Sequence, residues 1–298
     1  MSGVQSRIVA RDPSQSVRRI GLRQPWHGDL YHRTLTLGWG SFIALAAVIY
    51  VAANMIFAWL YWLQPDSVAN ARPGSLLDMF FFSVETFATV GYGVMAPQTL
   101  YANVIMTIET LVGIMTVALT TGLLFTRVSR PTAQVLFAQV AVIDTYNGAP
   151  ALMVRMGNQR RSQIIEATVG LTLLRSETTS EGRFMRRFHD LTLLRPRTPV
   201  FALSFTAIHL IDASSPLYGV TAQTLLSSES ELLVTVTGLE ETMGQTVHAR
   251  TSYLPDEIRI GAHYSDIFSQ DDTGRRSIDY SRFHAVEPTP DRTATGGV

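Results

Sequence analysis

Two membrane-length apolar segments constrain the fold more than any other feature of this sequence. Residues 34–63 contain no charged side chain, and residues 98–128 contain one interior charge, that of Glu109. At about 1.5 Å per residue, a helix of either segment is longer than a hydrocarbon core of about 30 Å. This length argues against core helices of a soluble protein. We therefore expect two membrane spans, over about 37–63 and 99–128.

A short helical pattern lies between the two spans. Residues 75–88 are apolar enough to enter a membrane but too few to cross it. Ser75 is a plausible N-cap, and Asp78 follows at the spacing of a capping box. A short helix at membrane depth persists only when it is buried in protein or lines a watery cavity. Since its C-terminal end carries partial negative charge, it would favour a cation there. The pattern predicts a pore helix over 75–88.

The pentapeptide that follows this helix, residues 89–93, reads Thr-Val-Gly-Tyr-Gly. Alone, these residues would also suit a β-turn of a soluble hairpin. Their position after a short helix and between two spans favours a potassium selectivity filter, whose sequence they match. The predicted K⁺ ligands are backbone carbonyls and one hydroxyl, from Thr89, Val90, Gly91 and Tyr92.

Such a filter requires a backbone that alternates between ordinary and left-handed dihedral angles. Gly91 and Gly93 adopt the left-handed conformation at little steric cost. One strand cannot surround an ion, so the motif implies a ring of four copies.

Two carboxylates and two glycines lie close to this filter in the sequence. Glu85 on the predicted pore helix and Glu109 in the second span are expected to support the filter, since an unpaired carboxylate at this depth is costly. Gly113 and Gly122 lie inside the second span. Each is either a gating hinge or a point of close helix packing, and the sequence does not choose between them.

The arginines predict the orientation. The N-terminal arm carries six of them, the loop between the spans carries only Arg72, and Arg127 and Arg130 follow the second span directly. The positive-inside rule then places both termini in the cytoplasm. Residues 1–25 read as a flexible arm, within the first 33 residues that show no apolar signal-peptide core. Residues 26–36 read as a helix at the membrane interface, with a plain linker as the alternative.

The remainder of the chain reads as a second, soluble domain. The pore domain is expected over 37–130, and Pro131 ends its last helix. Residues 131–284 hold β-rich runs separated by turn residues, including an Asn147-Gly148 hairpin signal, and predict an all-β sandwich. Residues 285–298 are rich in Pro, Thr and Gly and are expected to be disordered. No phosphate-binding loop, metal-ligand spacing or catalytic triad order is present, so we expect no enzyme and no cofactor. The formal net charge is zero, and nucleic acid is not an expected partner.

The order of interfacial helix, span, pore helix, filter, span and sandwich resembles the inward-rectifier potassium channels, in particular their prokaryotic branch. The resemblance covers roughly residues 22–284. It extends to Arg-Met-Gly-Asn-Gln-Arg at 155–160, Arg-Phe-His-Asp-Leu at 187–191, Ile-Asp-Ala-Ser-Ser-Pro-Leu-Tyr at 211–218, Ala-Arg-Thr-Ser-Tyr at 249–253 and Tyr-Ser-Arg-Phe-His at 280–284. It implies a homotetramer with an immunoglobulin-like cytoplasmic domain, in the bilayer of a bacterial inner membrane.

The resemblance also implies roles for further residues. Phe125 matches a gate at the bundle of inner helices, with a lipid-facing side chain as the alternative. Val117 matches a cavity position where strong rectifiers carry Asp, so tight polyamine trapping is not expected here. Arg127, Arg130 and Arg160 match positions linked to anionic lipid or phosphoinositide. Glu166 and Glu240 match carboxylates of the cytoplasmic pore that attract cations, Mg²⁺ or polyamine, with plain surface charge as the alternative. Met95 stands where eukaryotic members carry the Arg that pairs with Glu85.

Two functions of different classes follow from these observations. The first is a passive potassium channel, for which K⁺ is the permeant ion. The second is a membrane-tethered β-sandwich that binds a partner and has a non-conducting pore. The intact filter pentapeptide favours the channel.

Overall fold

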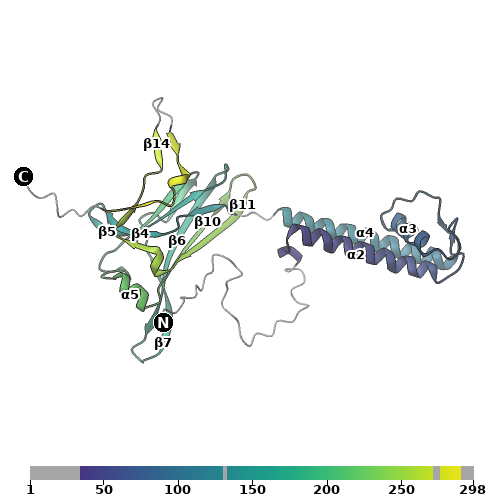
Figure 1. The fold of residues 1–298 in the computed structure, drawn as a ribbon, viewed down its shortest axis with the longest axis horizontal. Coiled ribbons are helices and arrows are strands. Elements are labelled where there is room, and N and C mark those ends of the chain that lie inside the picture. The colour runs from purple at the N-terminus through teal and green to yellow at the C-terminus, as the bar shows by residue number, and fades with distance from the viewer. Residues whose placement is uncertain (1–33, 130–132, 271–275, 290–298) are drawn as a thin grey trace, which may run out of the picture. The chain divides into compact units, whose positions relative to one another are not determined.

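The computed structural model describes residues 34–129, 133–270 and 276–289 (Figure 1). The chain forms two compact units, which meet in the sequence between residues 130 and 131. The predicted flexible arm and residues 26–33 of the predicted interfacial helix lie outside the described residues. Residues 34–36 of that helix are helical.

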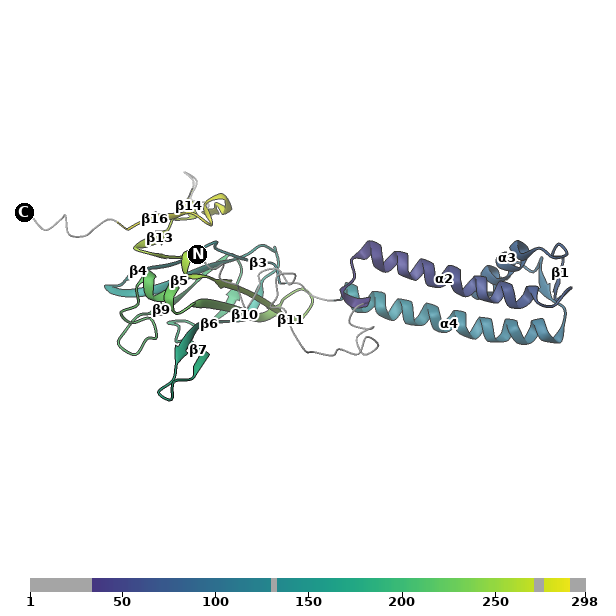
Figure 2. The ribbon, with the colours of Figure 1, turned by 60° about the horizontal axis from the view of Figure 1, so that its bottom comes forward.

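Two long helices dominate the first unit. Helices α2 (Trp39–Trp62) and α4 (Leu100–Val128) run side by side, and α3 (Leu76–Phe87) packs at one end of the pair (Figures 1 and 2). Both α2 and α4 are long and apolar enough to cross a membrane. Each lies within the predicted span, and α3 lies within the predicted pore helix.

The short helix is held by aromatic packing and by a small ribbon. On α3, Phe82 meets Tyr61 of α2 with ring centroids 5.0 Å apart, and Phe87 meets Tyr50 at 5.5 Å. Strand β1 (Val68–Ala69) pairs with β2 (Ala96–Pro97). This pairing ties the loop before α3 to the loop after the filter, so the filter segment is fixed on both sides.

The second unit is a sandwich of two five-stranded sheets. One has the order β11-β10-β6-β7, with β8 also paired to β6, and the other has the order β12-β4-β5-β3, with β9 also paired to β5. The strands are β3 (Val135–Phe137), β4 (Ala141–Tyr146), β5 (Ala149–Asn158), β6 (Ile164–Thr178), β7 (Phe184–Leu191), β8 (Arg197–Phe201), β9 (Ser204–Leu210), β10 (Glu231–Glu240), β11 (Gln245–Tyr253) and β12 (Ile258–Ile260).

Shorter elements complete this unit. They are helix α5 (Ala222–Ser227), the 3-10 turns Pro255–Glu257 and Tyr280–Arg282, and strands β13 (Ala262–Tyr264), β14 (Phe268–Gln270), β15 (Arg276–Ile278) and β16 (Val286–Pro288). The buried core lies between the two large sheets and includes Leu152, Leu171, Leu232 and Val234. The predicted β-sandwich is therefore present.

Three details of the sandwich test the sequence analysis. Asn147 and Gly148 have φ values of 50° and 87°, the left-handed pair that a two-residue hairpin between β4 and β5 requires. One of the β-rich runs on which the sandwich prediction rests, residues 200–211, contains parts of two strands, because β8 pairs with β6 in one sheet and β9 pairs with β5 in the other. The prediction that residues 285–298 are disordered is wrong for residues 286–288, since β16 pairs with β13.

Candidate functional site

The pore helix α3 begins at a specific cap. The Ser75 hydroxyl accepts a hydrogen bond from the Asp78 backbone N–H at 3.2 Å. The Asp78 carboxylate does not complete the expected capping box. It accepts instead from the backbone N–H and the guanidinium of Arg72, at 2.8 and 2.6 Å. The hydrogen-bonded guanidinium holds the pKa of Asp78 well below its usual range. The loop before α3 is thus fastened to its first turn.

The filter backbone alternates as the sequence analysis expected. Gly91 and Gly93 have φ values of 58° and 79°, and Thr89 has 55°, while Val90 and Tyr92 are outside the left-handed region. Period-two alternation turns successive carbonyls to the same side of the strand, which is the arrangement a row of ion ligands needs. Thr89 was not expected to be left-handed. A β-branched residue avoids this region, so its conformation is imposed by the surroundings rather than by its own preference.

The end of α3 fixes the first filter residues. The backbone carbonyl of Glu85 accepts from the N–H groups of Val90 and Gly91, at 2.8 and 3.4 Å. The Glu85 side chain is half-buried, and within the described part of one protomer it receives no hydrogen bond. Glu85 therefore supports the filter through its backbone, which the sequence analysis did not foresee.

Glu109 lies at the centre of a buried polar network behind the filter. Its carboxylate accepts from the Tyr61 hydroxyl at 2.7 Å and from the Ser83 hydroxyl at 2.5 Å. Ser83 also lies 3.0 Å from the Asn54 side-chain oxygen. All four side chains are fully buried, and they come from α2, α3 and α4. The network joins the three helices, as expected of a support residue.

Three members of this network were missed. In the sequence, Tyr61 stands beside Trp59 and Trp62 at the end of the first span, which is typical of an interfacial aromatic belt, and these two tryptophans are about half exposed. Asn54 and Ser83 carried no functional interpretation. The signal available was their polarity: each is an uncharged polar side chain in an apolar helix, where hydrogen-bonding partners are required.

The two glycines of α4 differ. A side-chain Cβ at Gly113 would overlap the backbone carbonyl of Phe87, at the end of α3, whereas Gly122 has open space around it. At Gly113 the structure supports the close-packing alternative. The carbonyl that packs against Gly113 is that of Phe87, which lies two residues before the filter.

The inner half of α4 carries the predicted cavity and gate residues. Val117 and Phe125 are eight residues apart, on one i, i+4, i+8 row, and are 58% and 72% exposed in the protomer. Both therefore face surroundings outside their own protomer, either lipid or a shared pore.

Arg127 makes contacts that the sequence analysis did not expect. Its guanidinium donates to the backbone carbonyls of Thr34 and Leu37, at 2.8 and 2.5 Å. The same group lies over the rings of Trp39 and Phe42, 4.9 and 4.6 Å from their centroids. It therefore fastens the end of α4 to the segment that leads into α2. Arg130 lies outside the described residues.

The second unit, which is the β-sandwich and is called the soluble unit from here on, holds the other predicted residues. Arg160 lines a cavity of about 750 Å³ together with Arg161 and His284. Glu166 is exposed and stands at a bulge of β6, with φ at 51° and a register shift in the facing strand β10. Bulges commonly re-aim a side chain.

The structure contradicts the pore-lining role predicted for Glu240. It is only 2% exposed, and its carboxylate accepts from the Met243 N–H at 2.8 Å. Hydrogen bonds from the Ser162 hydroxyl and from this N–H lower the pKa of Glu240 below its usual range. A buried carboxylate that binds its own turn does not present its charge to a cytoplasmic pore.

Comparisons with known proteins agree with this geometry. Residues 135–296 match the family model of the inward rectifier potassium channel C-terminal domain, and residues 38–130 match an ion channel model. The chain is 47% identical to the inward rectifier potassium channel Kirbac3.1 of Paramagnetospirillum magnetotacticum, covering 94% of this chain and 95% of that one. It is 29% identical to ATP-sensitive inward rectifier potassium channel 11 of Oryctolagus cuniculus, covering 97% and 81%.

A third relative is G protein-activated inward rectifier potassium channel 1 of Bos taurus, at 30% identity over 88% of this chain and 57% of that one. The matched models together cover both units of the structure, and the full-length relative covers nearly the whole chain. This is a membrane protein and an ion channel rather than an enzyme, and a homotetramer is consistent with its family. The chain belongs to the inward rectifier potassium channel family.

Proposed function

We propose that four copies of this chain bring residues 89–93 together around one axis and conduct K⁺ passively between them. The observation that carries this proposal is the left-handed conformation at Thr89, Gly91 and Gly93 in an exposed segment. Successive carbonyls aimed at one side form a row in one copy and rings in four. Rings of carbonyls replace the hydration shell of a potassium ion.

Uptake of ⁸⁶Rb⁺ by liposomes containing the purified protein tests conduction. We expect uptake that Ba²⁺ blocks, and we expect Gly91→Ala to abolish it, because a Cβ is strained at φ 58°. Gly182→Ala is a matched control, since Gly182 has a φ of 77° in a turn of the soluble unit. Absence of uptake by the wild-type protein, or uptake that Ba²⁺ leaves unchanged, would contradict conduction.

The gate is proposed at Phe125. Four bulky apolar side chains around the axis would close a pore by excluding water. We expect Phe125→Ala to raise ⁸⁶Rb⁺ uptake, and Leu124→Ala, about 100° further round the same helix, to leave it nearly unchanged. Equal uptake by wild type and Phe125→Ala would remove this residue from the gate. Gly122 is proposed as the hinge nearest this gate, since no neighbouring atom restricts it.

Anionic lipid is the proposed modulator, with Arg127, Arg130 and Arg160 as its contacts. Arg160 is the sharpest of these to test, because it shares its cavity with a second arginine. We expect phosphatidylinositol 4,5-bisphosphate in the liposomes to change uptake by the wild type, and Arg160→Gln to lose that response. Arg195→Gln, elsewhere on the soluble unit, should keep it. A response retained in Arg160→Gln would refute this contact.

We propose that cations entering from the cytoplasm block the pore only weakly, and that they meet Glu166 and Val117 along the ion pathway. Val117 places no charge in the cavity, so spermine or Mg²⁺ should block weakly. Val117→Asp should strengthen the block by adding a carboxylate in a low-dielectric pore. Unchanged block would place residue 117 outside the ion pathway.

The proposed location is a bacterial inner membrane with both termini in the cytoplasm. Its support is the arginine asymmetry across the two spans. The chain contains no cysteine, so one introduced at Ser180 in the soluble unit provides a unique label. We expect a membrane-impermeant maleimide to label it only after the cells are broken. Labelling of intact cells would contradict the proposed orientation and place the soluble unit outside the cytoplasm.

A further inference from the structure

One side chain holds the outer end of the filter segment. The side-chain amide of Asn70 donates to the backbone carbonyl of Val94 at 2.7 Å. Val94 directly follows Gly93, the last residue of the filter pentapeptide. Asn70 directly follows β1, the strand that pairs with β2 beyond the filter. The contact therefore joins the loop before α3 to the residue at which the filter ends.

The two ends of the filter differ in how they are held. At the inner end, two backbone N–H groups of the filter donate to the Glu85 carbonyl. Over residues 92–95, the hydrogen bond from Asn70 is the one that joins the segment to the rest of the described protomer. Met95 has no donor in its side chain and packs against the apolar cluster of the pore unit. Without the Asn70 amide, the outer end would be held by hydrogen bonds only from Ala96 on, where β2 begins.

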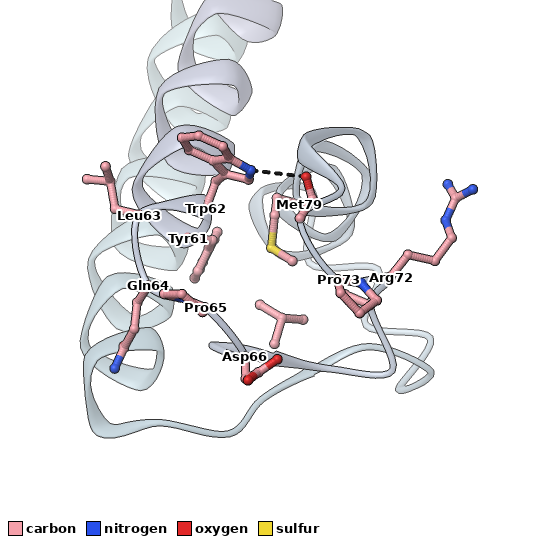
Figure 3. Close-up of a pocket in the computed structure, with 12 residues that line it drawn as sticks. Tyr61, Trp62, Leu63, Gln64, Pro65, Asp66, Arg72, Pro73 and Met79 are labelled. Carbon is pink, nitrogen blue, oxygen red and sulfur yellow. Dashed lines mark hydrogen bonds between the residues drawn. The ribbon is translucent and has the colours of Figure 1, made fainter.

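The loop that carries Asn70 is itself anchored to α2. The indole N–H of Trp62 donates to the backbone carbonyl of Gly74 at 3.1 Å, which joins the two ends of this loop (Figure 3). The buried hydroxyl of Ser67 donates to the backbone carbonyl of Tyr61, near the end of α2, at 2.8 Å. A supporting side chain fixes a site only when its own element is rigid. Asn70 meets this condition through α2.

The backbone offers a second reason for an asparagine at position 70. Its φ is 61°, in the left-handed region that Asn and Gly adopt more readily than other residues do. The backbone alone would therefore accept Gly. The Val94 carbonyl needs a donor, which the amide of Asn supplies and Gly lacks. Asn70→Gly thus removes the hydrogen bond and leaves the backbone unstrained, so it separates the two reasons.

We propose that Asn70 is a positioning residue of the selectivity filter, which fixes the outermost carbonyls at the spacing that a dehydrated cation requires. This inference rests on the proposed conduction through residues 89–93. A site that is already ordered binds more tightly, because binding does not have to order it. In four copies the hydrogen bond acts four times around one ion.

Inhibition of ⁸⁶Rb⁺ uptake by Ba²⁺ tests this role, because the half-inhibitory concentration does not depend on the amount of protein in the liposomes. Asn70→Gly should raise that concentration at least about twofold, the factor that one hydrogen bond of about 0.5 kcal/mol produces. It should also lower the ratio of ⁸⁶Rb⁺ to ²²Na⁺ uptake. Asn147→Gly is the matched control, since Asn147 is an exposed, left-handed asparagine of the soluble unit, and should change neither quantity. A wild-type value of either quantity in Asn70→Gly would overturn the proposal.

A second measurement covers a variant that folds but does not conduct. K⁺ bound in the filter should raise the melting temperature of the wild-type protein above its value in Na⁺. Asn70→Gly should reduce this difference, and Asn147→Gly should keep it. An undiminished difference in Asn70→Gly, or no difference in the wild type, would overturn the proposal. Wild-type protein without Ba²⁺-sensitive uptake would instead refute conduction, and the melting temperatures would still decide on Asn70.

Discussion

Removing the Tyr61 hydroxyl should destabilise the pore unit more than removing any comparable neutral hydrogen bond. In Tyr61→Phe, the fully buried Glu109 carboxylate loses one of its two hydrogen-bond donors, while the ring and its packing against Phe82 stay. Tyr101→Phe is the matched control. The Tyr101 hydroxyl also joins α4 to α2, but it donates to a neutral acceptor, the Leu60 carbonyl, at 2.9 Å.

The expected magnitudes differ because the acceptors differ. A hydrogen bond to a charged group contributes about 1.5–3 kcal/mol, and a neutral one about 0.5–1.5 kcal/mol. Within membranes, side-chain hydrogen bonds average only about 0.6 kcal/mol, because the unfolded state finds other partners. The Tyr101→Phe loss should lie near that value. Tyr61→Phe should cost about 1.5–3 kcal/mol, since it leaves a buried carboxylate short of a donor.

Equilibrium unfolding in mixed micelles, by titration with sodium dodecyl sulfate, measures both losses. Adding Glu109→Gln to Tyr61→Phe gives a double-mutant cycle, and the combined loss should be smaller than the sum of the single losses by at least about 1 kcal/mol. If the two losses add, or if Tyr61→Phe costs no more than Tyr101→Phe, the carboxylate is not the group that the hydroxyl stabilises.

Three further predictions concern other contacts. Gly113→Ala should lower ⁸⁶Rb⁺ uptake at least severalfold, because its Cβ overlaps the Phe87 carbonyl and overpacking costs about 1–3 kcal/mol; unchanged uptake would show that α4 yields freely. Arg155→Met should lower the melting temperature of the soluble unit, because the buried guanidinium donates to Ser265 and would leave its carbonyl unpaired; thermal unfolding measures this. Asp78→Asn should destabilise at pH 7. Because the folded pKa of Asp78 is depressed, that difference should shrink below about pH 4 and vanish in acid; a difference independent of pH would contradict the Arg72 pairing.

Local chemistry determined most of what the sequence could predict. The spans follow from length and the absence of charge, and the hairpin at 147–148 follows from the left-handed preference of Asn and Gly. The filter follows from a pentapeptide whose glycines permit the required backbone. In each case the cause lies within a few neighbouring residues, so no tertiary information is needed.

The errors arise where the cause is a distant residue. Tyr61 resembles a belt residue until Glu109, 48 positions later, is placed beside its hydroxyl. The hydrogen bond from Arg127 to the carbonyl of Thr34, 93 positions earlier, likewise has no signal in the local sequence. The family resemblance implies a pore-lining role for Glu240, and only the turn that follows β10 shows that its carboxylate accepts a hydrogen bond from Met243. Such pairings depend on the packing of elements, which no local pattern contains.

The contacts of α4 divide it into a fixed half and a freer half. Its buried residues, Ala102, Glu109 and Gly113, all belong to the half that packs beside α3 and the filter. Beyond Gly113, the side-chain hydrogen bonds that join α4 to another part of the described protomer are those of the Arg127 clasp on the segment before α2. A displacement of the inner half therefore leaves the network behind the filter intact, provided that the clasp opens or moves with it. With the proposed gate at Phe125, this arrangement would separate selectivity from gating along one helix, because the contacts that hold the filter are not those that a moving inner end must break.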